Sequence, residues 1–205
     1  MSVMSLAPSP KARTAIAELP VPSVWLDNVE LHAAVLQTLG PVRVRQEISA
    51  PAVCELELDL TGELSRPGRG MELRLRMEGA ADDLFAGEVV VVSHLLGPDG
   101  IHRVRLRAFD KSHRLRQTSA VTSRTDMTAT KLAGELAGQH DLGVSADEDG
   151  PEWPRIIQRG ESDAELLSRV LSDAGLWWQL DGDELRLRRW ETIDEYEVTW
   201  GADLF

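Results

Sequence analysis

Strict alternation of apolar and charged residues is the feature that most constrains what this 205-residue chain can fold into. Residues 54–60, CELELDL, place Cys54 and three leucines on one face and three carboxylates on the other. Residues 71–77, MELRLRM, repeat the pattern with a glutamate and two arginines on the polar face. Because a period of two residues is typical of a strand with one buried face, we expect both segments to be half-buried strands.

A long β-hairpin is predicted next. Residues 85–92, FAGEVVVV, are rich in β-branched residues, and the GPDG sequence at 97–100 is a turn signal. Residues 101–109, IHRVRLRAF, then alternate again, which is the pattern of a return strand.

A basic stripe and an acidic stripe lie on these predicted strands, formed by Arg103, Arg105 and Arg107 and by Glu55, Glu57 and Asp59. We expect the two stripes to pair across neighbouring strands, since opposite charges facing each other stabilise a sheet. The alternative is that these residues line a channel or a subunit interface. The basic stripe, Glu55 and Glu57 are therefore candidate interface residues.

The second half of the chain changes to helical spacing. Residues 128–139, TATKLAGELAGQ, place apolar residues on one helical face, with a threonine or an aspartate available as the N-cap. Residues 161–175 predict a second helix more strongly, because Ser162 and Glu165 form a capping box before an apolar face and a glycine follows as the C-terminal cap.

Two adjacent tryptophans, Trp177 and Trp178, follow the second predicted helix. They lie in a predicted strand that the turn at 181–183 joins to the next strand, so the two strands form a hairpin. Neighbouring strand residues point to opposite faces, so only one ring can lie in a one-sided core. The other ring either packs against a second element of the same chain or anchors a subunit interface. The chain has six tryptophans in all: Trp25, Trp153, Trp177, Trp178, Trp190 and Trp200.

The charge of the chain excludes a dedicated nucleic-acid binder. The formal net charge is −12, whereas affinity for phosphates needs a basic face. Most of the acidity lies in residues 141–205, which hold 17 aspartates and glutamates against 6 arginines. We interpret this region as a solvated surface that keeps the protein soluble, the alternative being a field that steers a basic partner.

No complete catalytic or metal-binding motif is present. The sequence lacks a phosphate-binding loop, an HExxH helix, paired CxxC motifs and a GxSxG elbow, and its five histidines have no metal-ligand spacing. The acidic clusters at 147–150 and 181–184 are interpreted as a loop and a hairpin turn rather than calcium sites. We therefore assign no catalytic residue, cofactor or metal, and the single cysteine excludes an intrachain disulfide.

The N-terminal residues 1–22 contain four prolines among small residues, which predicts a flexible arm. They do not form a signal peptide, and no stretch of about 18 apolar residues occurs in the sequence. We expect synthesis in the cytoplasm without stable membrane insertion, followed by incorporation into a larger particle or release by lysis.

Three blocks of sequence carry a resemblance to a known family. They are FAGEVVVVSHLLGPDGIHRVRLRAFDKSHRLRQ, TDMTATKLAGELAGQHDLGV and IIQRGESDAELLSRVLSDAGLWWQLDGDELRLRR. In their order and spacing they resemble the phage late-control D family, which is similar to the hub portion of VgrG proteins in contractile injection systems. The matching positions are Phe85, Gly87, Asp110, His113, Leu115, Thr128, Gln158, Ser162, Asp163, Leu166, Leu167 and Gly175.

This resemblance implies an α+β, strand-dominated fold with tube-type split β-barrels and an intervening helical segment. We expect a first tube-type domain at 23–125, a helical segment at 126–175, and a hairpin with the start of a second, possibly incomplete tube-type domain at 176–205. The implied role is a baseplate hub that forms a homotrimer and joins a hexameric tail tube to a trimeric spike. The implied partners are the tail tube protein, a spike or spike-tip protein and other baseplate subunits.

Two alternative functions follow from other features. The tryptophans and acidic clusters would suit a cell-wall hydrolase or a carbohydrate-binding tail component. A split barrel could also bind a small ligand.

Overall fold

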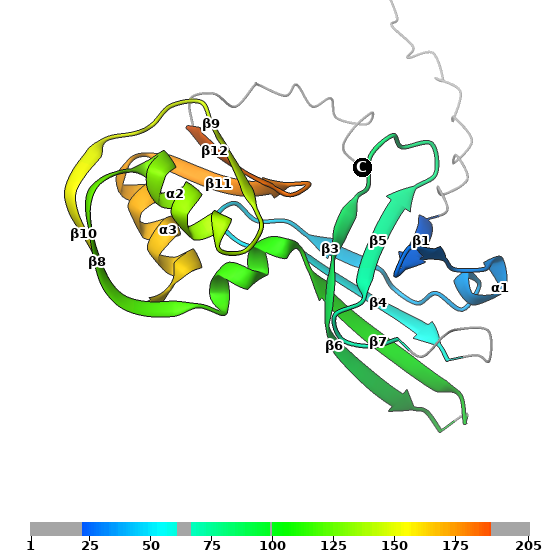
Figure 1. Cartoon of the computed structure of the whole chain (residues 1–205). Helices are drawn as coiled ribbons and strands as arrows, with labels where there is room; N and C mark the ends of the chain where they lie inside the picture. Colours follow the sequence, from blue (N-terminus) through cyan, green and yellow to red (C-terminus); the bar gives the residue numbers. More distant parts are fainter. Residues whose placement is uncertain (1–21, 61–66, 99, 190–205) are drawn as a thin grey trace, which may run out of the picture.

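The computed structural model describes residues 22–60, 67–98 and 100–189 and has an α+β fold dominated by strands, as predicted (Figure 1). In chain order the elements are β1 (Pro22–Leu26), β2 (Val29–Glu30), α1 (Ala33–Leu36), β3 (Arg43–Arg45), β4 (Val53–Asp59), β5 (Glu72–Met77), β6 (Phe85–Leu96), β7 (His102–Phe109), the 3-10 helix η1 (Lys111–Arg116), β8 (Ser119–Thr128), α2 (Ala129–Gly138), β9 (Gly143–Ala146), β10 (Glu152–Ser162), α3 (Asp163–Asp173), β11 (Leu176–Asp181) and β12 (Glu184–Arg189). None of the described helices is long and apolar enough to cross a membrane.

The first part of the chain forms a seven-stranded sheet in the order β2-β1-β5-β6-β7-β4-β3. All of its strand pairs are antiparallel. The two alternating segments form β4 and β5, and the long hairpin forms β6 and β7, so these three predictions are confirmed. Strands β2 and β3 lie at the two edges, and within the described residues the sheet does not close into a barrel.

One face of this sheet is a hydrophobic core. In β4 buried residues alternate with half-buried ones, as the period of two requires. Burying a leucine side chain stabilises a fold by roughly 1.5–3 kcal/mol, so this face supplies much of the stability of the sheet. The core residues are Val24, Leu26, Leu31, Val35, Cys54, Leu56, Leu58, Leu73, Leu75, Phe85, Val89, Val104, Leu106 and Ala108.

Cys54 is buried in this core, as predicted. Burial, with a smaller contribution from Glu55, raises the pKa of its thiol to about 12. Because the thiolate is the reactive form, we expect iodoacetamide at pH 8 to alkylate the native protein roughly a hundredfold more slowly than the protein in urea. Mass spectrometry of alkylation time courses checks this, and equal rates in both states would show that β4 opens readily.

The long hairpin requires a close approach of two backbones. Its strands β6 and β7 pair with a register shift between Val89 and Val91. A Cβ atom at Gly87 would collide with the carbonyl oxygen of Phe109 on the neighbouring strand. Glycine is therefore needed at this position, where it lets the two strands approach each other.

The rest of the described chain forms a second unit around α2 and α3. Figure 1 shows β8 and β10 as a two-stranded ribbon that curves around these helices. Strand β12 pairs antiparallel with β11 and parallel with β9, which gives a three-stranded sheet. The core of this unit consists of Leu115, Ala129, Leu132, Ala133, Leu136, Ala137, Leu142, Ile156, Ala164, Leu166, Leu167, Val170, Leu171, Leu176, Trp178, Leu185 and Leu187.

Both predicted helices begin at predicted caps. The hydroxyl oxygen of Thr128 accepts a hydrogen bond from the backbone N–H of Lys131 at 3.2 Å. Ser162 and Glu165 form both halves of the capping box at the start of α3. Gly175 follows α3 with a φ of +70°, a conformation that favours glycine.

The two adjacent tryptophans lie on opposite faces of β11. Trp178 is 0% exposed in the core of the second unit, and its indole N–H donates to the hydroxyl of Ser168 at 3.0 Å. Trp177 is 7% exposed and is therefore buried as well. The folded chain covers both rings, and the interface role expected for them stays a prediction.

Hydrogen bonds join the two units. The backbone N–H of Ser49, in the connection before β4, donates to the carbonyl of Trp178 at 2.8 Å. The guanidinium of Arg114 in η1 pairs with Glu88 of β6 and also donates to the carbonyl of His140, after α2, at 3.4 Å. Segments far apart in the sequence thus hold the seven-stranded sheet and the helical unit together.

Several predicted features lie outside the described residues. They are the N-terminal arm up to residue 21, positions 61–66 of the polar connection, Trp190, Trp200, and the part of the second tube-type domain beyond residue 189. Pro22 belongs to β1, so the strand begins one residue inside the predicted arm. The expected helical segment 126–175 also contains the strands β9 and β10.

Candidate functional site

The charged stripes of β4 and β7 face each other, as predicted. The register places Glu55 opposite Arg107, Glu57 opposite Arg105 and Asp59 opposite Arg103. The three pairs have nitrogen–oxygen distances of 2.6, 3.0 and 3.4 Å in that order. The stripe is therefore balanced in charge, and a role of its residues in a channel or interface stays a prediction.

A double-mutant cycle on Glu57 and Arg105 should give a small coupling energy. The side chain of Arg105 is 57% exposed, and solvent screens an ion pair of this kind. We expect Glu57→Gln and Arg105→Gln to show a coupling below about 1 kcal/mol in urea unfolding. A coupling of several kcal/mol would mean that the face is shielded from water in solution.

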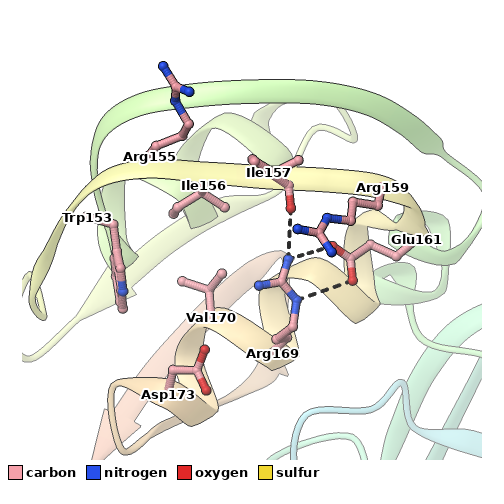
Figure 2. A pocket seen from close by; sticks show the side chains of 9 residues that line it. All are labelled: Trp153, Arg155, Ile156, Ile157, Arg159, Glu161, Arg169, Val170 and Asp173. Atoms are coloured by element: carbon pink, nitrogen blue, oxygen red, sulfur yellow. Dashed lines mark hydrogen bonds and ion pairs between the residues drawn. The ribbon is translucent and has the colours of Figure 1, made fainter.

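A groove of about 500 Å³ lies between β10 and α3 (Figure 2). Trp153, Ile156 and Val170 face the space between strand and helix, whereas Arg155 points away from the helix. The groove thus has an apolar floor and a charged rim. Its lining residues are Trp153, Arg155, Ile156, Ile157, Arg159, Glu161, Arg169, Val170 and Asp173.

One end of the groove is organised by Arg169. Its guanidinium pairs with Glu161 at 2.6 Å and donates to the backbone carbonyl of Ile157 at 3.1 Å. The hydrogen bond that Arg169 donates to the carboxylate of Glu161 raises the pKa of Arg169. Glycosidic hydrolysis needs a protonated acid beside an ionised carboxylate, whereas Glu161 is held in an ion pair. The ion pair and the bond to Ile157 thus fix this end of the groove.

Several polar residues that carry the family resemblance are buried and structural. The carboxylate of Asp110 accepts from the backbone N–H of Ala52 at 2.7 Å and from that of Ser112 at 2.9 Å. Burial raises the pKa of Asp110, and its hydrogen bonds offset part of the rise. A ring nitrogen of His113 lies 2.8 Å from the carbonyl of Asp110. This cluster fixes the exit of β7 against the entry of β4.

A second buried polar cluster lies under the ribbon. The amide of Gln158 donates to the carboxylate of Asp163 at 2.8 Å and accepts from the guanidinium of Arg124 at 3.0 Å. Arg124 also pairs with Glu135 of α2 at 2.8 Å. The cluster ties both strands of the ribbon to both helices. No local sequence pattern indicates this role, although Gln158 and Asp163 stand among the matching positions of the resemblance.

The two acidic clusters form a loop and a hairpin turn, as predicted. Glu148 pairs with Arg189, and Asp183 pairs with Lys111 at 2.6 Å. Within the part of the chain that the structure describes, no group of three histidine, cysteine or acidic side chains is placed to hold a metal ion. The clusters act here as partners of basic side chains.

The chain has a strand-dominated α+β fold held together by structural polar clusters, and comparison with known proteins gives its family. The model of the phage tail baseplate hub (GPD) family matches residues 47–192. The chain belongs to this family, which is structural. No curated protein sequence matches the chain.

Solved structures of tail proteins share the fold. The chain is similar to the 43 kDa tail protein of prophage MuSo2 from Shewanella oneidensis, with a TM-score of 0.68, 16% identity, and coverage of 82% of this chain and 53% of that one. A tail protein from Neisseria meningitidis has a TM-score of 0.64 and 17% identity, and the match covers 82% of this chain and 50% of that one. An Escherichia coli component of the type VI secretion system has a TM-score of 0.60 and 17% identity, and the match covers 73% of this chain and 48% of that one. The chain spans about half the length of these proteins.

Proposed function

We propose that the chain is a subunit of the hub that joins the tail tube to the spike in a contractile injection machine. In this proposal it assembles as a homotrimer. It contacts the tail tube protein, a spike or spike-tip protein and other baseplate subunits, and it is incorporated into a phage tail or a similar particle.

The observation that carries the proposal is the family match over residues 47–192. The role of the buried polar residues supports it. Asp110, Gln158 and Asp163 make hydrogen bonds that hold neighbouring elements together. Links between the two units, such as that from Ser49 to Trp178, suit a part that transmits force between neighbours.

The proposal also concerns the domains. We assign the seven-stranded sheet to the first tube-type domain of a split β-barrel, with the predicted limits 23–125. Residues 126–175 would be the insert of helices and ribbon strands, and residues 176–205 would begin the second tube-type domain. In the trimer, two such domains per subunit would present six similar surfaces to a hexameric tube.

Native mass spectrometry and light scattering test the assembly. The proposal predicts a species with three copies of the 22.7 kDa chain at high protein concentration. Mixing with the tail tube protein of the same particle should give a larger complex. A stable monomer at all concentrations, both alone and with the tube protein, would contradict the proposal.

A further inference from the structure

Strand β10 has one paired edge and one open edge. Within the described chain it pairs only with β8 in a two-stranded ribbon, and its other edge borders the groove over α3. Open strand edges present backbone groups that can pair with another chain. A groove beside such an edge is a place where an extended segment can add as a strand.

The bond from Arg169 shows the direction in which the open edge points. Arg169 donates to the carbonyl of Ile157, and we infer from this bond that the carbonyl points to the groove rather than to β8. In a strand the N–H and C=O groups of one residue point to the same edge. The groups of the residues two positions before and after it point to that edge as well, and those of the adjacent residues point to the opposite edge. The backbone groups of Arg155, Ile157 and Arg159 therefore face the groove, while those of Ile156 and Gln158 face β8.

The groove has room and an apolar floor for a strand. Its volume of about 500 Å³ runs along β10 from Trp153 to Glu161. Trp153, Ile156 and Val170 line the inner side. On the outer side of the ribbon Ile157 is 42% exposed and Val121 is 85% exposed, and both belong to the same face. A strand added at this edge would lie next to Ile157, whereas Val121 belongs to β8 on the other side of β10.

The positive charge along the edge of the groove favours binding of an acidic segment. Arg155 and Arg159 are exposed and form no ion pair within the described residues, and they alternate with Ile157 along the outer face. Opposite charges across neighbouring strands attract. The net charge of the chain is −12, so these arginines form a local basic rim on an acidic protein.

We propose that the open edge of β10 binds an extended acidic segment of a partner protein, which adds to the ribbon as a third strand. Its acidic residues lie beside Arg155 and Arg159, and an apolar residue between them lies beside Ile157. Small apolar side chains on its other face lie beside the partly buried Trp153, because Ile156 and Val170 are already buried in the core. This site lies on the helical unit, and the proposal is independent of how the hub trimer forms.

Hydrogen exchange measured by NMR tests the open edge in the chain alone. The N–H groups of Arg155, Ile157 and Arg159 should exchange with water at least tenfold faster than those of Ile156 and Gln158, because only the latter face β8. Equal protection along the whole strand would overturn the inference, since it would mean that this edge is already paired.

Binding of a defined probe tests the occupant. The probe is a blocked, fluorescein-labelled octapeptide of threonine, valine and glutamate in which two glutamates flank a valine at alternate positions. We expect it to bind and to protect the three fast N–H groups. A lysine version of the peptide, and a version N-methylated at alternate amides, should bind at least tenfold more weakly.

Variants locate the probe on the chain. Arg155→Glu with Arg159→Glu should weaken binding at least tenfold, whereas Lys131→Glu, an equal change per site on the exposed side of α2, should not. Ile157→Pro removes one outward N–H and should abolish binding while circular dichroism shows a retained fold. Absence of binding at millimolar probe, equal binding of the lysine peptide, or protection by a second copy of the chain instead of the probe would each overturn the proposal.

Discussion

Replacing Trp178 by alanine is expected to lower the free energy of unfolding by about 4 kcal/mol. The ring is 0% exposed in the core of the second unit, and its N–H donates to Ser168 at 3.0 Å. The substitution leaves a large cavity and removes one bond of the Ser168 hydroxyl, which still donates to the carbonyl of Ser49 at 3.4 Å. The backbone bond from Ser49 to residue 178 stays possible. Urea unfolding followed by circular dichroism measures the loss.

Two controls separate the cavity from other effects. Ser168→Ala keeps the indole and removes its hydrogen bond together with the longer bond from Ser168 to the carbonyl of Ser49, and it should cost about 1 kcal/mol. Trp153→Ala removes an indole that is only partly buried, so its cost should be smaller than that of Trp178→Ala. A loss below about 1 kcal/mol for Trp178→Ala would contradict the packing described for β11.

Replacing Asp110 by alanine should be the second most damaging change, with a loss of about 3 kcal/mol. Its carboxylate accepts from the N–H groups of Ala52 and Ser112 and from the hydroxyl of Ser112, and alanine leaves these buried donors without a partner. The loss of stability arises mainly because these donors are buried away from water on folding and find no acceptor in place of the carboxylate. Thermal and urea unfolding both measure it.

Asparagine is the matched control at this position. Asp110→Asn keeps one acceptor oxygen in nearly the same volume, so it should retain about half of the stability that alanine loses. Equal losses in both variants would mean that the negative charge itself is required. If neither variant changed the free energy of unfolding, the hydrogen bonds of Asp110 would not stabilise the contact between the end of β7 and the start of β4.

The strands with one apolar face could be predicted from the sequence, and those without one could not. Strands β4, β5 and β7 alternate because one face is buried in a large core. The ribbon strands β8 and β10 have an exposed outer face, and their inner face carries the polar residues Arg124 and Gln158. A pattern of hydrophobicity therefore does not indicate them.

The candidate sites depend on contacts between distant residues, which local patterns do not reveal. The pairing of Glu57 with Arg105 was predictable because both strands show complementary stripes. The groove arises where β10 passes over α3, and its ion pair joins Glu161 to Arg169. The bond from Ser49 to Trp178 spans 129 positions of sequence, and neither segment has a motif that indicates its partner.

The most direct test of the hub assignment is cryo-electron microscopy of particles purified from producing cells that carry an epitope on this chain. The account predicts three copies in a ring at the end of the tail tube where the spike begins, with the seven-stranded sheet of each copy in the wall of the ring. Particles with complete tubes and spikes but without this chain at that junction would contradict the account.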